Sequence, residues 1–238
     1  MSKSIFIVGT NTDIGKTFVS GGIMHTLNKI NIKSCYFKPV QSGAPEKEQE
    51  ELSDVEFIKQ ISSIKQDEKD MNTYSFEEPL SPHLAAKRQG TLIDKTKILK
   101  QYRELKKRCD YIVIEGAGGV IVPITENYYI YDLIKDMNSK VIVVASSEVG
   151  TINQTCLTLN FMKREGIEVS GVVINRYKGE FYEDDNIKMI EKNSGINVKS
   201  IIKDINIENE DLEYSNFETL AKREYNENLN KEIVLGLF

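Results

Sequence analysis

The stretch "IFIVGTNTDIGKTF", residues 5–18, constrains the fold of this chain more than any other. An apolar run typical of a buried strand ends at Gly9, a short polar bend follows, and Gly15-Lys16-Thr17 opens an amphipathic stretch. Glycines let a backbone curl so that several N–H groups point at phosphate oxygens, and the following helix adds the positive end of its dipole. A strand, such a loop and a helix in this order predict a phosphate-binding site.

The loop is a variant of the common pattern G-x-x-x-x-G-K-[ST]. The slot of the first glycine holds Thr10, and Gly9 lies one residue earlier. The lysine of such a loop reaches the terminal phosphates of a nucleotide, and the hydroxyl after it can ligate Mg²⁺. We therefore expect the nucleotide to be bound by the residues of the bend and the helix start, namely Asp13, Ile14, Gly15, Lys16, Thr17 and Phe18.

Apolar runs alternate with amphipathic stretches along the chain. The expected strands cover residues 4–9, 34–40, 111–115, 141–145, 171–175 and 198–202, and the expected helices cover 16–28, 53–64, 96–108, 130–137, 151–165 and 185–193. Several strands are unbroken β-branched runs, which suit strands covered on both faces. The alternation predicts an α/β fold of the P-loop NTPase type: a mainly parallel β-sheet flanked by helices on both faces.

Residues 1–238 are expected to form one domain, since no Pro-, Gly- or Ser-rich linker divides them. Residues 41–52 are expected to form a solvated loop and 67–82 a long connection. The net charge of −5 argues against a nucleic-acid partner. Cys35, Cys109 and Cys156 are too scattered for a disulfide framework or a zinc site, so we expect reduced thiols. The chain shows neither a signal peptide nor a membrane-spanning run, which favours the cytoplasm.

Ligands of open α/β sheets lie beyond the carboxyl ends of the strands, where this chain places several charged residues. Lys38 ends the second run, in "FKPVQSG", and is either a solvated lysine or a second cation beside Lys16. Two neighbouring cations repel unless an anion lies between them, which favours a negatively charged substrate. Glu115 ends "YIVIE", from where such folds reach Mg²⁺, and a glycine run follows it.

Other strand and helix ends allow two readings each. Asp54, next to a capping box of Ser53 and Glu56, complements the helix dipole or serves the site. The turn at 150–153 caps a helix or offers free N–H groups to a carboxylate. Asn175 forms a turn or contacts a base, and His83 lines the site or caps a helix without a role in proton transfer. His25 is expected to pack in its helix.

The segments "GTNTDIGKT", "FKPVQSG", "SPH" and "VIEGAGG" resemble, in order and spacing, the dethiobiotin synthetases of biotin synthesis. The resemblance extends from the first strand to about Asn175, and the phosphate loop of that family is similarly lengthened. It implies an ATP-dependent ligase in which 7,8-diaminononanoate takes up CO₂ as a carbamate, ATP phosphorylates the carbamate, and the second amine closes a cyclic urea.

The resemblance also implies roles for the residues named above. Lys16 and Lys38 would be the catalytic residues and would flank the carbamate and the γ-phosphate. Thr17, Asp54 and Glu115 would be the ligands of Mg²⁺. Thr12 and Ser42 match substrate-contacting positions, and Gly150, Thr151 and Asn153 would hold the distant carboxylate of the substrate at a two-fold homodimer interface. Backbone amides of Gly116, Ala117 and Gly118 would face substrate and phosphate, and Asn175 would face the base.

The chain departs from the family after the sixth expected strand. A proline-containing turn commonly borders the adenine there, whereas this chain reads "SIIKDINIENED" and has no proline after Pro123. We therefore expect looser nucleotide selectivity. The alternative function is an ATPase switch of the partitioning or division-site type, but such loops usually carry an early extra lysine where this chain has Val8-Gly9-Thr10. A glutamine-dependent synthase would need a further domain that 238 residues do not accommodate.

Overall fold

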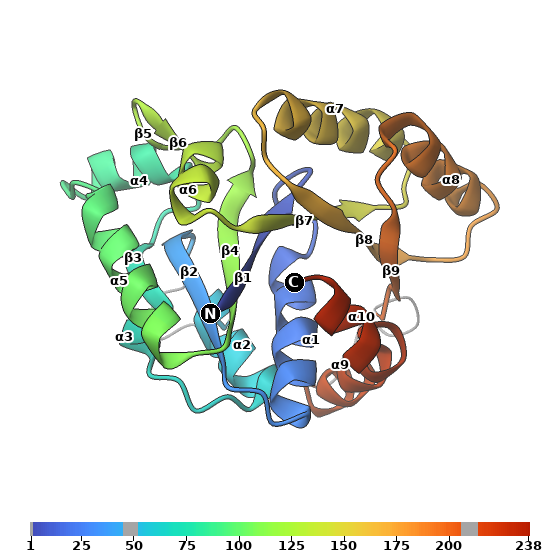
Figure 1. Cartoon of the computed structure of the whole chain (residues 1–238), viewed down its shortest axis with the longest axis horizontal. Helices are drawn as coiled ribbons and strands as arrows, with labels where there is room; N and C mark the ends of the chain where they lie inside the picture. Colours follow the sequence, from blue (N-terminus) through green and yellow to red (C-terminus); the bar gives the residue numbers. More distant parts are fainter. Residues whose placement is uncertain (1, 45–51, 206–213) are drawn as a thin grey trace.

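A seven-stranded sheet forms the centre of the computed structural model, which describes residues 2–44, 52–205 and 214–238 (Figure 1). The strand order is β3-β2-β4-β1-β7-β8-β9, and all neighbouring strands pair in parallel. The strands are β1 (Lys3–Gly9), β2 (Ser34–Ser42), β3 (Asn72–Phe76), β4 (Tyr111–Gly119), β7 (Lys140–Ser146), β8 (Val169–Tyr177) and β9 (Val198–Lys203). The predicted parallel sheet is confirmed.

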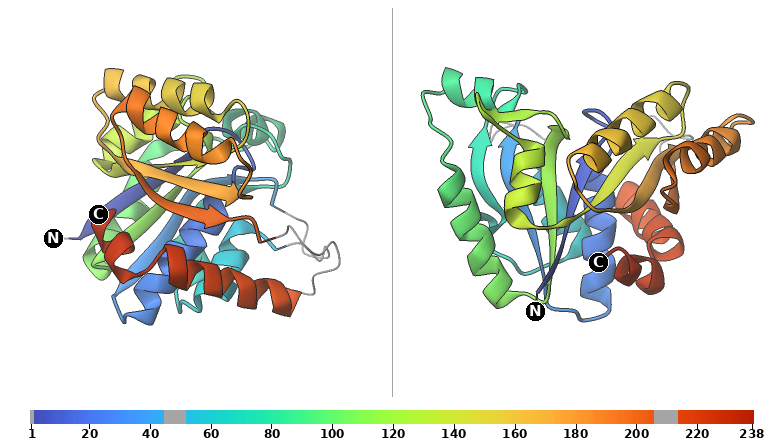
Figure 2. Two further views of the ribbon diagram at one scale, coloured as in Figure 1. Left: turned by 90° about the vertical axis from the view of Figure 1, so that its right-hand side faces the viewer. Right: turned by 45° about the horizontal axis from the view of Figure 1, so that its top comes forward.

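Helices cover both faces of the sheet, as the β-branched strands predicted (Figures 1 and 2). In β1, Ile5 and Ile7 pack with α1 (Lys16–Lys29), whereas Phe6 and Val8 point into the opposite layer. The α1 face also carries α2 (Asp54–Ser62), α3 (Glu68–Met71), α9 (Tyr214–Asn228) and α10 (Lys231–Gly236). The other face carries α4 (Pro82–Arg88), α5 (Lys95–Arg108), α6 (Ile130–Met137), α7 (Thr151–Arg164) and α8 (Glu183–Ser194).

All six expected strands and all six expected helices are present, with ends shifted by a few residues. The expectation of a long connection at 67–82 was wrong, because α3 and the edge strand β3 lie within it. Strand β3 is short and mostly polar, but Tyr74 and Phe76 alternate onto the core and hold it beside β2. Gln41 and Ser42 extend β2 rather than the expected loop, of which residues 45–51 lie outside the described part.

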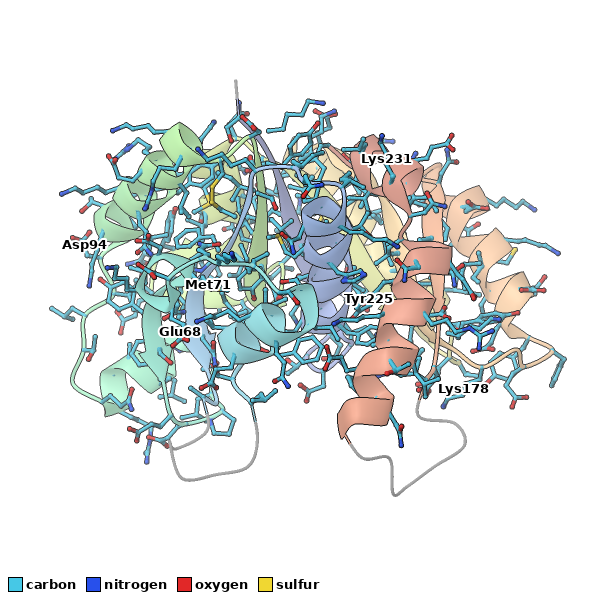
Figure 3. The ribbon with its side chains drawn as sticks, turned by 90° about the horizontal axis from the view of Figure 1, so that it is seen from below. Glu68, Met71, Asp94, Lys178, Tyr225 and Lys231 are labelled. Carbon is cyan, nitrogen blue, oxygen red and sulfur yellow. A yellow bond between two sulfur atoms is a disulfide. The ribbon has the colours of Figure 1, made fainter. Side chains whose placement is uncertain are left out.

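Besides α3, β3 and α4, the sequence analysis did not foresee the hairpin of β5 (Pro123–Thr125) and β6 (Tyr128–Tyr129) or the two C-terminal helices. Helices α9 and α10 pack along α1, where Tyr225 donates a hydrogen bond to the carbonyl of Phe18 at 2.9 Å (Figure 3). Thr26 similarly donates to the carbonyl of Leu229 at 2.6 Å. The end of the chain therefore supports the helix that follows the phosphate loop.

The expectation of three reduced thiols was wrong for two of them, because Cys35 and Cys109 form a disulfide (Figure 3). Their Cα atoms lie 6.0 Å apart, within the usual range for a disulfide. Cys35 is the second residue of β2 and Cys109 precedes β4, and these strands pair, so the topology joins cysteines that are 74 residues apart. Cys156 is a free thiol. Within the described residues, each helix is too short or too polar to span a bilayer.

Candidate active site

The phosphate loop leaves β1 at Gly9 and folds back over it. A Cβ atom on Gly9 would lie 2.6 Å from the Ile14 side chain and 2.7 Å from the Asn11 carbonyl oxygen, so only glycine fits. This close approach explains why the glycine stands one residue early. Asp13 (φ 55°) and Gly15 (φ 90°) adopt left-handed conformations that complete the bend before α1 begins.

Lys16 is buried in this loop with little to balance its charge. Its ammonium group reaches the Asn11 carbonyl oxygen at 3.4 Å, and it forms no ion pair within the described residues. Burial lowers the pKa of Lys16, and the more distant carboxylates of Glu115 and Asp54 offset this only in part. Such a lysine is suited to an anion supplied from outside the chain.

Lys38 is equally buried but fully paired. Its Nζ donates to Asp54 Oδ2 and, at 2.9 Å, to Glu115 Oε1. Burial alone would lower the pKa of Lys38, but the two carboxylates outweigh burial and raise it. The sequence argument placed a bound anion between the two lysines and did not consider carboxylates of the chain itself. The chain itself supplies anions to Lys38, because β4 lies beside β2 and α2 follows β2.

Oxygen atoms gather beside this ion pair in a manner that fits a divalent cation. Thr17 Oγ1 lies 2.9 Å from Asp54 Oδ1 and 2.8 Å from Glu115 Oε1. The hydroxyl has one hydrogen and donates to one carboxylate at a time, so its second short contact with a carboxylate oxygen is left without a hydrogen. A hydroxyl with two carboxylates is the donor set that Mg²⁺ prefers. The three residues predicted from the sequence therefore converge and could hold Mg²⁺.

The start of α2 combines a helix cap with a site residue. The predicted capping box is confirmed, since the Ser53 hydroxyl accepts from the Glu56 amide and the Glu56 carboxylate accepts from the Ser53 amide. Asp54 is therefore not needed as a cap and turns toward Lys38 and Thr17. Burial alone would raise the pKa of Asp54, but its bonds to Lys38 outweigh burial and lower it.

Tyr36 forms a hydrogen bond with Glu115, and the sequence analysis did not name it as a site residue. It is fully buried, and its hydroxyl donates to Glu115 Oε2 at 2.9 Å. Burial and the neighbouring Glu115 charge raise the pKa of Tyr36 well above its ordinary value, so the phenol stays protonated and remains a donor. Residues two apart on a strand share a face, so the pair Tyr36 and Lys38 was readable from the alternation along β2.

A central cavity of about 380 Å³ brings most of the predicted residues together. It is lined by Thr12, Asp13, Gly15, Lys16, Thr17, Lys38, Ser42, Asp54, Glu115, Ala117, Gly118 and Arg176. A second cavity of about 460 Å³ adjoins it and shares Thr12, Asp13, Ser42, Asp54, Ala117 and Gly118 with it. The second cavity extends to the loop at 79–82 and is called the outer cavity below.

A third cavity of about 310 Å³, the α9 cavity, opens on the other side of Thr17. Its aromatic wall consists of Phe18, Phe57 and Phe217, with ring centroids 6.1 Å apart for Phe18 and Phe217 and 6.4 Å for Phe57 and Phe217. Asn175 lines it too and donates to the Ile14 carbonyl oxygen at 3.0 Å. The sequence analysis missed seven residues of this cavity: Leu52, Phe57, Arg176, Lys203, Asp204, Ile205 and Phe217.

Some predicted residues lie apart from these three cavities within the described chain. Gly116 packs against the Phe6 ring. The Ile14 side chain is buried, and its backbone carbonyl oxygen accepts the hydrogen bond from Asn175. His83 lines a separate cavity near the β5–β6 hairpin and contacts Ser81 Oγ at 3.0 Å. The start of α7, with Gly150, Thr151 and Asn153, lines none of the three.

The loop before α7 is nevertheless held firmly by one buried carboxylate. Glu183 accepts a hydrogen bond from Ser147 Oγ and two more from the backbone amides of Lys178 and Glu180, at 3.0 and 2.7 Å. Asn186 adds a bond to the Ser147 carbonyl oxygen at 2.8 Å. These contacts fix the β7–α7 connection, which turns at Gly150 with φ of 98°.

Comparison with known proteins decides the family. The model of a family described as "AAA domain" matches residues 3–207. ATP-dependent dethiobiotin synthetase BioD of Fusobacterium nucleatum is 42% identical over 90% of this chain and 98% of its own. The chain belongs to the dethiobiotin synthetase family. The synthetase of Clostridium kluyveri is 39% identical over 86% of this chain and 87% of its own, and that of Caldicellulosiruptor saccharolyticus 34% over 99% of both.

Solved structures with a similar fold include ATPases of the alternative class considered above. A ParA family ATPase of Chlorobium tepidum has a TM-score of 0.57 and 13% identity, covering 100% of this chain and 98% of its own. MinD of Pyrococcus horikoshii has a TM-score of 0.54 and 14% identity, covering 100% and 94%. Identity this low shows a shared P-loop NTPase fold alone, whereas the sequence relatives identify an ATP-dependent ligase of biotin synthesis.

Proposed function

We propose that this dethiobiotin synthetase forms the cyclic urea of dethiobiotin from 7,8-diaminononanoate, CO₂ and ATP, with the chemistry in the central cavity. The observation that carries the proposal is the meeting of Lys16, Lys38, Thr17, Asp54 and Glu115 at one cavity. A nucleotide-binding protein without ligase activity has use for the phosphate loop but not for a second buried lysine on β2.

The reaction proceeds in three steps. One amine of the diamine attacks CO₂ and loses a proton, giving a carbamate. A carbamate oxygen attacks the γ-phosphorus of ATP and ADP leaves, giving a carbamic–phosphoric anhydride. The second amine then attacks the carbonyl carbon and loses a proton, and the carbon–oxygen bond breaks to release phosphate. Negative charge moves between carbamate and phosphate oxygens, so preorganised cations at this position lower the barrier most.

The two lysines divide this work. Lys16 binds the terminal phosphates, because its buried charge has no ion-pair partner within the described chain. Lys38 faces the carbamate, while Glu115 and Asp54 hold its ammonium in place. Thr17, Asp54 and Glu115 would hold Mg²⁺, which when bound neutralises charge on the phosphate oxygens. Tyr36 keeps Glu115 oriented.

The remaining residues bind the ends of the substrates. ATP places its base in the α9 cavity beside Asn175, Gly15 and Phe18, and its phosphates in the central cavity, which Asp13 lines. The diamine lies in the outer cavity beside Thr12 and Ser42, near the Ala117 and Gly118 backbone. We still predict that the enzyme discriminates less between nucleotides than is usual for the family. Residues 206–212 of the proline-free segment, on which this prediction depends, lie outside the described part. Comparing turnover with ATP, GTP and CTP tests it, and strong preference for ATP contradicts it.

A homodimer would complete the site with the start of α7. Gly150, Thr151 and Asn153 would receive the distant carboxylate of the diamine bound by the partner subunit. Val149, just before α7, and Leu157, within α7, are 84% and 63% exposed, and their burial would contribute to such an interface. Sedimentation at assay concentration tests this, and a fully active 27 kDa monomer would refute it. Because its substrates are small charged metabolites, we place the enzyme in the cytoplasm.

Product analysis tests the function as a whole. The protein is incubated with diamine, bicarbonate, MgATP and, separately, without each component. We expect a cyclic urea whose formation needs all three components and matches ADP release one to one. ATP hydrolysis that ignores the diamine and bicarbonate, with no cyclic product, would instead indicate a switch ATPase.

A further inference from the structure

The hydrogen bond between Ser81 and His83 joins two cavities. Ser81 lines the outer cavity, in which the diamine is placed. His83 lines a cavity of about 720 Å³ between α4, residues 91–93 and the β5–β6 hairpin, called the hairpin cavity below (Figure 1). Ser81 Oγ and His83 Nδ1 lie 3.0 Å apart. Two side chains in contact therefore lead from the outer cavity to the hairpin cavity.

The Ser81 hydroxyl is not used as a serine at this position usually is. Ser81 is the N-cap residue of α4, where a hydroxyl ordinarily accepts a hydrogen bond from an amide of the first helical turn. Within the described residues its side chain forms no such bond and contacts the His83 ring instead. A hydroxyl that donates to an imidazole nitrogen keeps two lone pairs, which can accept an N–H group in the outer cavity.

The position of the carbamate decides which amine faces Ser81. The carbamate is placed beside Lys38, which lines the central cavity, whereas Ser81 lines only the outer one of the three. The second amine, on the neighbouring carbon of the diamine, is then left toward the loop at 79–82. This amine must lose a proton when it closes the ring.

The carboxylates of the site are poor acceptors for this proton. Asp54 and Glu115 already accept hydrogen bonds from Lys38. Asp13 is the other acidic residue that lines the outer cavity within the described chain, and a carboxylate is a weaker base than an imidazole. Imidazole side chains are the usual general bases near neutral pH.

We propose that Ser81 and His83 form a relay that removes the proton of the ring-closing amine. The amine nitrogen bonds to the carbonyl carbon, the carbon–oxygen bond to phosphate breaks, and the nitrogen gives its proton to Ser81 Oγ. Ser81 passes its own proton to His83 Nδ1, and the imidazolium releases a proton to solvent through the hairpin cavity. This inference rests on the proposed function. It gives His83 a role in proton transfer that the sequence did not indicate.

The test removes the imidazole and supplies it again from solution. His83→Ala, Ser81→Ala and Ser81→Thr are compared with the unchanged protein, and cyclic urea and ADP are measured with the diamine, bicarbonate and MgATP. Each protein is assayed alone, with added imidazole, and with added pyrazole, which has a similar shape but is a much weaker base. Lys87→Ala is the matched control, because Lys87 is an exposed residue of α4 that lines the same cavity.

We expect His83→Ala and Ser81→Ala to slow ring closure about a hundredfold, within the range of general-base catalysis. Both should release more ADP than cyclic urea, because water cleaves the anhydride before the ring closes. Imidazole, but not pyrazole, should restore much of the rate of His83→Ala and none of that of Ser81→Ala. Ser81→Thr, which keeps the hydroxyl, should retain most of the rate, and Lys87→Ala should retain all of it.

Two results would overturn the relay: unchanged ring closure in Ser81→Ala, or equal rescue of His83→Ala by pyrazole and imidazole, which would show that His83 only fills space. The unchanged protein separates this failure from that of the proposed function. If it forms no cyclic urea, the function is wrong, whereas normal product in the protein and in both alanine variants rejects only the relay.

Discussion

Lys16 and Lys38 line the same cavity and are almost equally buried, at 7% and 6% exposure, yet their pKa values move in opposite directions. Burial lowers the pKa of Lys16. Burial acts on Lys38 too, but Glu115 and Asp54 reverse its effect and raise the pKa. Lys16 therefore lacks an ion-pair partner among the described residues and is suited to an anion from solution, whereas Lys38 already has two carboxylates within the chain. The two lysines differ in their nearest charges and not in their burial, so the nearest charges are the better guide to the role of each lysine.

The surroundings of the two lysines also differ in construction. The region around Lys16 is a short local loop shaped by Gly9 and Gly15, where backbone geometry does most of the work. The region around Lys38 is a network of side chains from three elements, namely β2, α2 and β4. Changes in the first region should act on nucleotide binding, and changes in the second on stability and chemistry.

The largest effect is expected from Lys16→Ala. Loss of the cation that meets the terminal phosphates should lower turnover by about a thousandfold and weaken ATP binding strongly. Stability should be unchanged or slightly higher, because a buried charge without an ion pair is removed. Calorimetry, turnover and urea unfolding measure the three quantities. Lys29→Ala, at the exposed end of α1, is the control. Normal ATP affinity in Lys16→Ala would contradict the assignment of Lys16 to nucleotide binding.

Glu115→Gln should have the next largest effect. The amide keeps the shape but removes a charge that Lys38 shares with the proposed metal. Turnover should fall at least tenfold, the Mg²⁺ concentration for half-maximal rate should rise, and unfolding should need less urea. Glu104→Gln, on the exposed face of α5, controls for general loss of negative charge. Normal activity of Glu115→Gln at low Mg²⁺ would remove Glu115 from the ligand set.

Asp54→Asn should show a smaller effect that depends on pH. The pKa of Asp54 is lowered in the folded protein, so its carboxylate contributes stability above the unfolded pKa. That contribution is lost as the pH falls through the folded pKa. At pH 7 the variant should be less stable by about 1 kcal/mol, because Asp54 is partly exposed. Urea unfolding of both proteins between pH 7 and 3 measures this gap. A gap that stays constant would contradict the pairing with Lys38.

The sequence predicted the loop around Lys16 well, and it predicted the side-chain network around Lys38 only in part. Gly15, Lys16 and Thr17 form a contiguous motif, and Lys38 and Glu115 each close an apolar run in the second half of β2 or β4, toward the sheet edge where parallel sheets place their ligands. The pairing of Lys38 with Asp54 and Glu115 was not foreseen, because it depends on β2 lying beside β4. The same strand neighbours joined Cys35 to Cys109.

Other features depend on packing that no local pattern records. Phe217 reaches the α9 cavity because α9 returns along α1, although α9 begins about 185 residues after α1 ends. Arg176 lines the same cavity at a point where β8 has one extra residue relative to β9. Strand β3 was hidden because a short edge strand with polar residues resembles a loop. Periodicity predicts the face that a residue occupies, but not the segment that packs against it.

The central claim is that Lys38 serves the carbamate and not the nucleotide. It is tested most directly on Lys38→Leu by measuring ATP affinity by calorimetry and product formation with the diamine and bicarbonate. Lys38→Gln is run beside it, because a neutral amide donates hydrogen bonds but carries no charge. Urea unfolding is followed for both variants, since Lys38 also neutralises Glu115.

The account predicts nearly normal ATP affinity in both variants. Product formation should fall by about two to three orders of magnitude, the scale of losing one preorganised donor, and Lys38→Gln should recover little of it. If Lys38→Leu, while still folded, loses ATP binding and product formation in equal measure, Lys38 is a nucleotide ligand and its assignment to the carbamate is wrong.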